Sequence, residues 1–222
     1  MEKLHFQRGD AILQTLSASD PILGGLIEKI GDYQLNLRSD CFPALVRSII
    51  GQQLSVKAAG TIWLRTQDLC VSKGDGSEFC PETILSLSEE ALRGAGLSRT
   101  KVVYIKDLAQ RVSAGELDFQ TLRLLPNLEI INRLTAVKGI GTWTAEMFLI
   151  FSLGRLDVLS LKDLGLRRAI QWLYGLKQSP VERTMLKYGK KWAPYQTVAS
   201  LYLWEVINRG LIKEDPGNLR VK

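Results

Sequence analysis

The sequence predicts an all-α protein of about ten helices. Apolar residues recur every three or four positions along most of the chain, which is the spacing of helices that bury one face. Residues that favour helix starts and helix ends stand at the edges of many of these segments. Loops of only a few residues join them, and short loops favour helices that pack against their neighbours.

The first third of the chain is predicted to contain four helices and one ambiguous segment. Gly31 ends the second helix, Pro43 fits the first turn of the third, and Ser55 can cap the fourth. Residues 33–37 could form a short strand, but no nearby segment is an obvious partner for it. The four helices are expected at residues 10–16, 21–30, 43–51 and 55–63.

The middle of the chain is predicted to alternate between helices and loops. Residues 72–81 have the most loop-like composition, and Gly94 and Gly96 close a short helix that begins at residue 88. Asn127 is expected to cap a later helix. Two longer helices are expected at residues 98–112, which are amphipathic, and at residues 143–153, which are apolar on nearly all sides and should be buried.

The last third of the chain is predicted to contain three helices. Asp163 stands directly before the first of them, and residues 179–182 (SPVE) form a capping box with proline at the first helical position. Gly210 ends the last helix. The first and last of these helices are expected at residues 164–174 and 195–209.

The charge and the cysteines limit the classes of function. The formal net charge is +6 and the pI is about 9.3, which suits a polyanionic partner. Cys41, Cys70 and Cys80 form no CxxC pair, so zinc ribbons and thioredoxin-like chemistry are not expected. The only histidine is His5, in what reads as an N-terminal tail, which argues against a histidine-based triad or a histidine-bound metal.

The sequence carries no recognisable signal for export or membrane insertion. The first residues are polar, and no signal peptide follows them. Apolar runs are interrupted by charged residues, as at Glu205, before they are long enough to span a bilayer. We therefore expect a protein of the cytoplasm and nucleoid, or of the nucleus, with no membrane partner.

A glycine pair marks the joint between two predicted helices. Gly139 and Gly141 flank Ile140, and glycine allows both positive φ and close approach by another molecule. Such a hairpin points main-chain amides outward at the start of the next helix, where they attract an anion such as a phosphate. The alternative is an ordinary helix end followed by a short turn.

Two aspartates lie about twenty residues beyond this hairpin. Asp163 precedes a helix, so the simplest interpretation is an N-cap. A carboxylate held at that place is also a fixed anion, which stabilises a cationic, oxocarbenium-like sugar transition state. The two roles are compatible, and we interpret Asp157 as structural.

Four segments together resemble the helix-hairpin-helix superfamily of DNA base-excision glycosylases. Their order and spacing match from about Pro43 to the last helix, and two of them resemble loops that probe the DNA at a lesion. The resemblance implies two helical lobes with a cleft for DNA and base between them: residues 38–153, including the hairpin, and residues 1–37 with 154–222. The four segments are residues 49–59 (IIGQQLSVKAA), 96–101 (GLSRTK), 134–145 (LTAVKGIGTWTA) and 157–166 (DVLSLKDLGL).

Trp143 indicates the branch of the superfamily. Members that also cut the DNA backbone carry a lysine at this position to form a Schiff base, although Lys138 lies just before the turn here. Tryptophan resembles the 3-methyladenine DNA glycosylase II branch, as does the segment from Trp192 to Thr197. The chain is too short for the extra N-terminal β domain of that branch's bacterial prototype. No cysteine follows Cys80, so no iron–sulfur cluster is expected.

The resemblance implies roles at the damaged base. Asp163 is the catalytic carboxylate, and Trp143 and Tyr195 are aromatic walls of the base pocket. Gln52 is expected to hydrogen-bond the base left without a partner, with Gln53 as the alternative. Leu97 is expected to wedge between base pairs from the minor groove.

The resemblance also implies roles at the DNA backbone. The amides of Gly139, Gly141 and Trp143, together with Thr144, are expected to hold a phosphate. The main-chain carbonyls of Lys138 and Ile140 are the expected ligands of a monovalent cation, and no other cofactor is implied.

These roles define the expected activity. It is a monofunctional glycosylase that flips alkylated purines of the 3-methyladenine and 7-methylguanine type out of double-stranded DNA and hydrolyses their N-glycosidic bonds in base-excision repair. The chain is expected to act as a monomer. The alternatives are a bifunctional oxidised-base glycosylase with lyase activity, and a helix-hairpin-helix module that binds DNA without catalysis.

Overall fold

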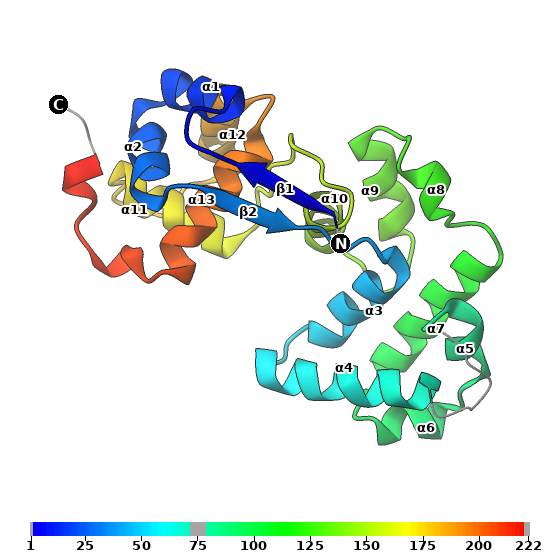
Figure 1. Ribbon diagram of the computed structural model, residues 1–222. Coiled ribbons are helices and arrows are strands. Elements are labelled where there is room, and N and C mark those ends of the chain that lie inside the picture. The colour runs from blue at the N-terminus through cyan, green and yellow to red at the C-terminus, as the bar shows by residue number, and fades with distance from the viewer. Residues whose placement is uncertain (1, 72–78, 220–222) are drawn as a thin grey trace. The chain divides into compact units, whose positions relative to one another are not determined.

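The computed structural model describes residues 2–71 and 79–219, and helices dominate it (Figure 1). The all-α prediction is confirmed, with thirteen α-helices among the described residues where about ten were expected. The helices that the sequence did not predict, Pro81–Ser86 and Phe119–Leu122, are short, because four to six residues contain too few turns to show a periodic pattern. Contacts divide the chain into two units, residues 1–37 with 149–222, and residues 38–148.

The unit of residues 38–148 is built around two packed helices. The buried face of α7 includes Val102, Ile105 and Leu108, as its amphipathic pattern predicted. This helix packs against α3, and α5 and α6 also contact it (Figure 1). The elements of this unit are α3 (Cys41–Gly51), α4 (Val56–Val71), α5 (Pro81–Ser86), α6 (Glu89–Gly94), α7 (Arg99–Ser113), α8 (Phe119–Leu122), α9 (Asn127–Thr135) and the first part of α10 (Thr142–Phe151).

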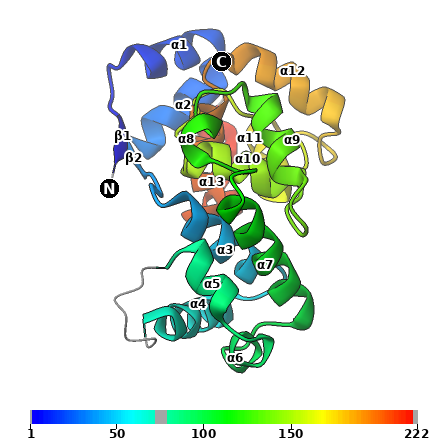
Figure 2. The same cartoon turned by 90° about the vertical axis from the view of Figure 1, so that its right-hand side faces the viewer.

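The other unit is built around its last long helix. The residues from Thr197 to Leu203 are all buried, and this helix, α13, contacts α2, α11 and α12. α11 and α13 lie side by side within this unit (Figure 2). The elements of this unit are β1 (Lys3–Phe6), α1 (Ala11–Ser19), α2 (Pro21–Ile30), β2 (Tyr33–Asn36), the end of α10, α11 (Leu164–Tyr174), α12 (Glu182–Trp192), α13 (Gln196–Asn208), and the 3₁₀ helices η1 (Leu211–Lys213) and η2 (Pro216–Leu219).

A buried carboxylate links three of these helices. Asp20 is 1% exposed and caps α2 by accepting from the amide of Leu23. Its Oδ2 also accepts from the hydroxyl of Tyr174 on α11, at 2.8 Å, and from the indole of Trp192 on α12, at 3.2 Å. Burial and the charge of Asp20 raise the pKa of the Tyr174 hydroxyl, which therefore stays protonated and donates.

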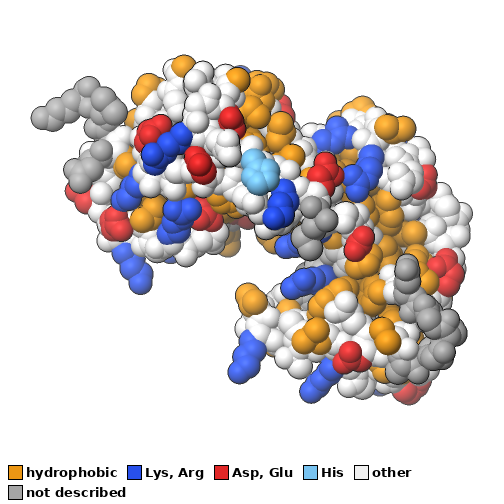
Figure 3. Space-filling view, in the orientation of Figure 1, with side chains coloured by type: hydrophobic (Ala, Val, Ile, Leu, Met, Phe, Trp, Pro, Cys, Tyr) orange, Lys and Arg blue, Asp and Glu red, His pale blue; other side chains and the backbone are white. Residues whose placement is uncertain are grey.

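The interpretation of the N-terminus as a tail was wrong. Residues 3–6 form β1, which pairs antiparallel with β2 and supplies the strand partner that was not evident in the sequence. Two helices separate the partners along the chain, so local patterns could not reveal the pairing. His5 lies opposite Gln34 on this ribbon and is exposed, as Figure 3 shows in pale blue.

Several predicted boundaries shift. The capping box at residues 179–182 does not begin a helix at Pro180, because α12 starts at Glu182 with Val181 as its N-cap. Pro126, and not Asn127, is the N-cap of α9. The second boundary between the units was expected after residue 153. It lies after Phe148, inside α10, because this one apolar helix continues without a break from one unit into the other.

Two further expectations concern single segments. The loop predicted at residues 72–81 lies mostly outside the described residues, which resume just before α5. In the described part of the chain, no helix combines the length and the apolar character needed to cross a membrane.

Candidate active site

Asp163 is held at the head of α11 by two donors. Its Oδ1 accepts from the amide of Leu166 at 2.6 Å, the N-cap bond that the sequence predicted, and from the indole Nε1 of Trp204 on α13 at 3.1 Å. The residue is 9% exposed. Two N–H groups from different helices thus hold the carboxylate in a fixed orientation at the N-terminus of α11.

Gly165 and Phe151 complete the surroundings of this carboxylate. A Cβ at position 165 would lie 3.3 Å from Oδ1 of Asp163 and 3.7 Å from Cδ1 of Trp204, so glycine leaves room where the two side chains meet. The indole of Trp204 stacks on Phe151, with ring centroids 5.8 Å apart. The tryptophan therefore has a defined position from which it donates.

Asp157 and Tyr195 lie in the same unit as Asp163. Asp157 accepts from the amide of Gln196 at 3.3 Å, at the first residue of α13, which agrees with a structural role. Tyr195 directly precedes this helix and is half-buried. Its main chain donates to the carbonyl of Trp192 at 2.7 Å and accepts from Ala199 at 3.1 Å, so the aromatic ring is attached to a well-anchored turn.

The glycine hairpin joins α9 to α10 in the other unit. Gly139 has φ of +80°, and a Cβ there would overlap the ring of Tyr104 on α7. Gly141 has no positive φ, and a Cβ at this position would meet no atom within 4 Å. The first glycine is therefore required by the fold, whereas the second leaves open space in front of the first turn of α10.

Contacts from neighbouring elements fix the hairpin. Asp107 on α7 accepts from the amide of Lys138 at 2.9 Å and lies 3.9 Å from its ammonium group. Gln52 donates its side-chain amide to the carbonyl of Gly139 at 2.7 Å. The hairpin thus has the rigid main chain that binding a phosphate through amides requires.

Residues 52–55 form the loop between α3 and α4, which we name the probing loop. Its two glutamines, Gln52 and Gln53, differ in exposure and in hydrogen bonding. The side-chain amide of Gln52 is engaged by the hairpin and half-buried, so it is not directed at an unpaired base as predicted. Gln53 is exposed and has φ of +57°, an uncommon conformation for a residue with a side chain. The alternative, Gln53, is therefore the side chain that the loop presents to solvent.

Lys101 supports the probing loop from α7. Its ammonium donates to the carbonyls of Ile50 and Gln52, each at 2.8 Å, and so satisfies acceptors at the end of α3. Partial burial lowers the pKa of this ammonium. Sequence reasoning missed this residue, because its partners lie some fifty positions away along the chain.

Two predicted DNA contacts are contradicted by burial. Leu97 is 4% exposed and belongs to the core, so it cannot wedge between base pairs; Leu54, within the probing loop, is an exposed apolar side chain, at 40%. Thr144 is 6% exposed, so its hydroxyl is not on the hairpin surface, whereas Thr142 is exposed at the start of α10. Both errors arise because local sequence does not show which side of a short segment faces the core.

Trp143 lies on the surface of the unit and not in its core. Its side chain is 46% exposed, on the first turn of α10, and it lines a cavity of about 520 Å³. Gln52, Gln53 and Leu54 line the same cavity, so the structure brings the probing loop and Trp143 together. Sequence reasoning missed two further members of this cavity, Arg38 and Arg47.

The hairpin carbonyls are the candidate ligands of a cation. Hard cations take oxygen ligands, and the main-chain oxygens of Lys138 and Ile140 have that chemistry. The adjacent carbonyls already accept hydrogen bonds within the protein. The carbonyl of Val137 accepts from the amide of Ile140, and that of Gly139 accepts from the side chain of Gln52. Elsewhere in residues 2–71 and 79–219, no group of three or more His, Cys, Asp or Glu side chains is placed to hold a metal.

Comparisons with known proteins agree on one family. The family described as "HhH-GPD superfamily base excision DNA repair protein" matches residues 46–194. DNA-3-methyladenine glycosylase 1 of Schizosaccharomyces pombe is 33% identical over 213 residues, covering 91% of this chain and 92% of the relative.

Two solved structures match this chain over 90% or more of its length. A DNA-3-methyladenine glycosidase from Bacillus halodurans is 43% identical, with a TM-score of 0.87 and 96% of each chain covered. The S. pombe 3-methyladenine DNA glycosylase in complex with abasic DNA is 33% identical, with a TM-score of 0.79, covering 90% of this chain and 97% of that one.

Proposed function

The chain belongs to the HhH-GPD superfamily of base excision DNA repair proteins, and from this premise we propose that it is a monofunctional DNA glycosylase for alkylated purines. The observation that carries the proposal is Asp163, whose Oδ1 is held by the amide of Leu166 and the indole of Trp204. A carboxylate fixed in this way is suited to stabilise positive charge on a sugar.

The reaction is a hydrolysis at the sugar carbon C1′. The bond from C1′ to the base nitrogen breaks with its electrons going to the base, and water supplies a hydroxyl group to C1′ and releases a proton. A 3-methyladenine or 7-methylguanine base is already cationic, so the bond is weak and needs no strong general acid. The carboxylate of Asp163 stabilises the oxocarbenium-like transition state by its negative charge.

The damaged base must leave the helical stack before this reaction. Flipping costs roughly a few kcal/mol and less at a damaged pair. We assign the exposed Gln53, in place of Gln52, to fill the gap and hydrogen-bond the partner base. Trp143 and Tyr195 offer electron-rich faces to the cationic ring, worth roughly 0.5–2 kcal/mol.

The residue at position 143 also determines what happens after base release. A lysine there would attack C1′ and allow strand cleavage through a Schiff base. Tryptophan has no nucleophilic nitrogen, so the proposed product is an intact abasic site. Trapping of a covalent enzyme–DNA adduct by borohydride would contradict this assignment.

The hairpin positions the DNA without reading its sequence. Amides of Gly139, Gly141 and Trp143 are proposed to bind a phosphate at the open face of Gly141, and the carbonyls of Lys138 and Ile140 to bind a monovalent cation. The proposed partner is double-stranded DNA containing damaged bases, bound by a monomer. The site of action is accordingly the nucleoid or the nucleus.

Base release from methylated DNA by the parent and by Asp163→Asn tests the proposal. Asparagine is as good an N-cap as aspartate, so the variant should fold and bind DNA while losing the negative charge. We expect release of 3-methyladenine to fall by roughly 100-fold or more. Asp157→Asn is the matched control, since Asp157 accepts from the amide at the start of α13 and has no role in the proposed reaction. Release by Asp163→Asn at the parent rate would contradict the proposal, and binding without release by the parent would favour a non-catalytic module.

A further inference from the structure

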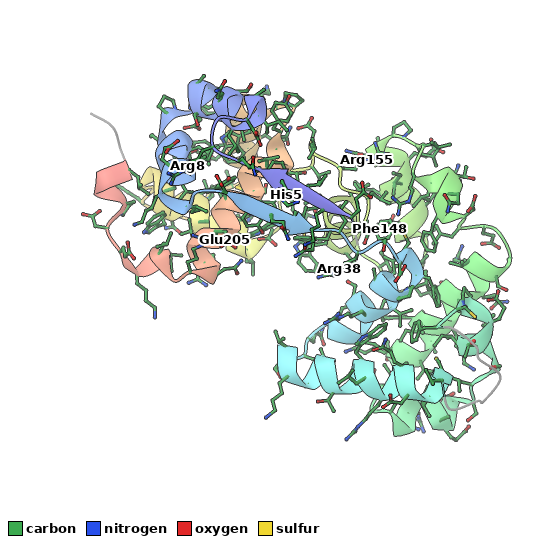
Figure 4. All side chains as sticks on the ribbon, in the orientation of Figure 1. His5, Arg8, Arg38, Phe148, Arg155 and Glu205 are labelled. Atoms are coloured by element: carbon green, nitrogen blue, oxygen red, sulfur yellow. The ribbon has the colours of Figure 1, made fainter. Side chains whose placement is uncertain are left out.

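The cavity lined by Trp143 has a charge that the alkylpurine proposal does not explain. All of its lining residues belong to the unit of residues 38–148, and the only charged ones are Arg38 and Arg47. Arg38 lies in the segment between β2 and α3 (Figure 4), and Arg47 is on α3 itself. The remaining lining residues are Ser48, Gly51, Gln52, Gln53, Leu54, Val56, Ala59, Gly60 and Trp143.

The two arginines line the same cavity, and the charge of one acts on the other. Burial, and then the positive charge of Arg47, lower the pKa of Arg38. Arg47 is held in place over the ring of Trp63, with its Cζ 5.9 Å from the ring centroid. Two arginines that line one hollow concentrate positive charge there, and an anion bound between them is attracted by both.

A cationic base cannot be that partner. The substrate class proposed above carries positive charge on its ring, and two guanidinium groups beside Trp143 would repel it. The same substrate also carries phosphates. Arginine is the residue best suited to them, because its planar group donates two parallel hydrogen bonds to phosphate oxygens.

We propose that Arg38 and Arg47 together bind one phosphodiester of the damaged strand, at a second phosphate site separate from the glycine hairpin. The inference rests on the proposed glycosylase function and adds a positioning site to it. With its charge neutralised by the two arginines, this phosphate anchors the strand beside the probing loop, which lines the same cavity. Binding here also removes the repulsion that the arginines would exert on a cationic base.

Binding to DNA with single neutral linkages tests the site directly. The ligand is a duplex that contains an uncleavable abasic-site analogue, with one methylphosphonate replacing one phosphodiester near the lesion, moved position by position. For the parent, we expect one phosphate position, in addition to those that the hairpin contacts, at which the neutral linkage weakens binding roughly tenfold or more. For the double variant Arg38→Gln/Arg47→Gln, neutralisation at that same position should have no further effect. The double variant should also show a salt dependence that is smaller by about 0.9 in log–log slope.

Arg65→Gln is the matched control. Arg65 is exposed on α4 in the same unit but does not line this cavity, and its removal changes the net charge by the same amount as each single variant. It should retain the parent's response to methylphosphonate at every position. Thermal unfolding of each variant is measured alongside, and Arg38→Gln alone tests the site if loss of the Arg47–Trp63 contact impairs folding.

Two results would overturn the proposal. One is a double variant that remains as sensitive as the parent to methylphosphonate at every position. The other concerns the ratio of the release rate of cationic 7-methylguanine to that of neutral hypoxanthine. We expect the double variant to lower both rates by the same factor, so that this ratio stays at the parent's value. A higher ratio in the double variant would place the arginines against the base. The binding experiment needs no base release, so a failure of the glycosylase proposal would be distinguishable from a failure of the phosphate site.

Discussion

At the scale of single residues, a donor far along the chain defines the candidate catalytic group. Asp163 would be an ordinary N-cap if the amide of Leu166 were its only donor. The indole of Trp204, 41 positions later, adds a second hydrogen bond and fixes the carboxylate from another helix. The sequence around residue 204 carries no motif that indicates this contact.

Trp204→Phe is predicted to slow base release roughly tenfold, because a hydrogen bond to a charged group is lost from Asp163 while the stacking on Phe151 remains. Single-turnover release of 7-methylguanine measures the effect. The control is Trp172→Phe, which removes an indole bond to the carbonyl of Glu214 in the same unit. Equal rates for the two variants would mean that Trp204 has no role in positioning the carboxylate.

At the scale of elements, the hairpin divides two functions between its glycines. Gly139 satisfies the fold, since φ is +80° and Tyr104 occupies the space of a side chain. Gly141 faces open space at the start of α10, where main-chain amides are directed outward. A motif of two glycines thus contains one structural position and one position that leaves room for a ligand.

The two glycines predict opposite phenotypes. Gly139→Ala should lower the free energy of unfolding by roughly 1–3 kcal/mol, because alanine is strained at positive φ and collides with Tyr104. Gly141→Ala should change stability by less than about 0.5 kcal/mol but weaken DNA binding, since a methyl group would obstruct the phosphate. Urea unfolding and fluorescence anisotropy with a duplex measure the two effects. A Gly141→Ala variant with parental affinity would remove the hairpin from the DNA contact.

At the scale of the whole molecule, the net charge of +6 fits a protein that binds a polyanion without reading its sequence. The candidate contacts with the phosphate backbone are the hairpin and the cavity with Arg38 and Arg47, both in the unit of residues 38–148. Asp163 and Tyr195 belong to the other unit. Groups for binding and groups for chemistry are therefore carried largely by different parts of the chain.

This separation predicts that binding and catalysis respond differently to salt. Affinity for an undamaged duplex should fall steeply as salt rises, with a log–log slope of about −0.9 for each phosphate contacted. Asp163→Asn should retain this slope, because the carboxylate makes no favourable contact with the backbone. Titrations at several salt concentrations provide the measurement. An affinity that does not change with salt would contradict a phosphate-based mode of binding.

The sequence by itself determined the features that depend on neighbouring residues. Helical periodicity predicted the fold class, the N-cap rule placed Asp163 at the start of α11, and the glycine pair located the hairpin. These predictions succeeded because the interactions behind them span only a few positions along the chain.

Only the tertiary structure decided the features that depend on distant residues. It paired β1 with β2, buried Leu97 and Thr144, and turned Gln52 toward the hairpin while leaving Gln53 exposed. It also brought Trp204 to Asp163, and Arg38 and Arg47 to the cavity beside Trp143. The physical reason is the same in each case: burial and partner choice are set by packing between elements, and a local pattern contains no information about which elements meet.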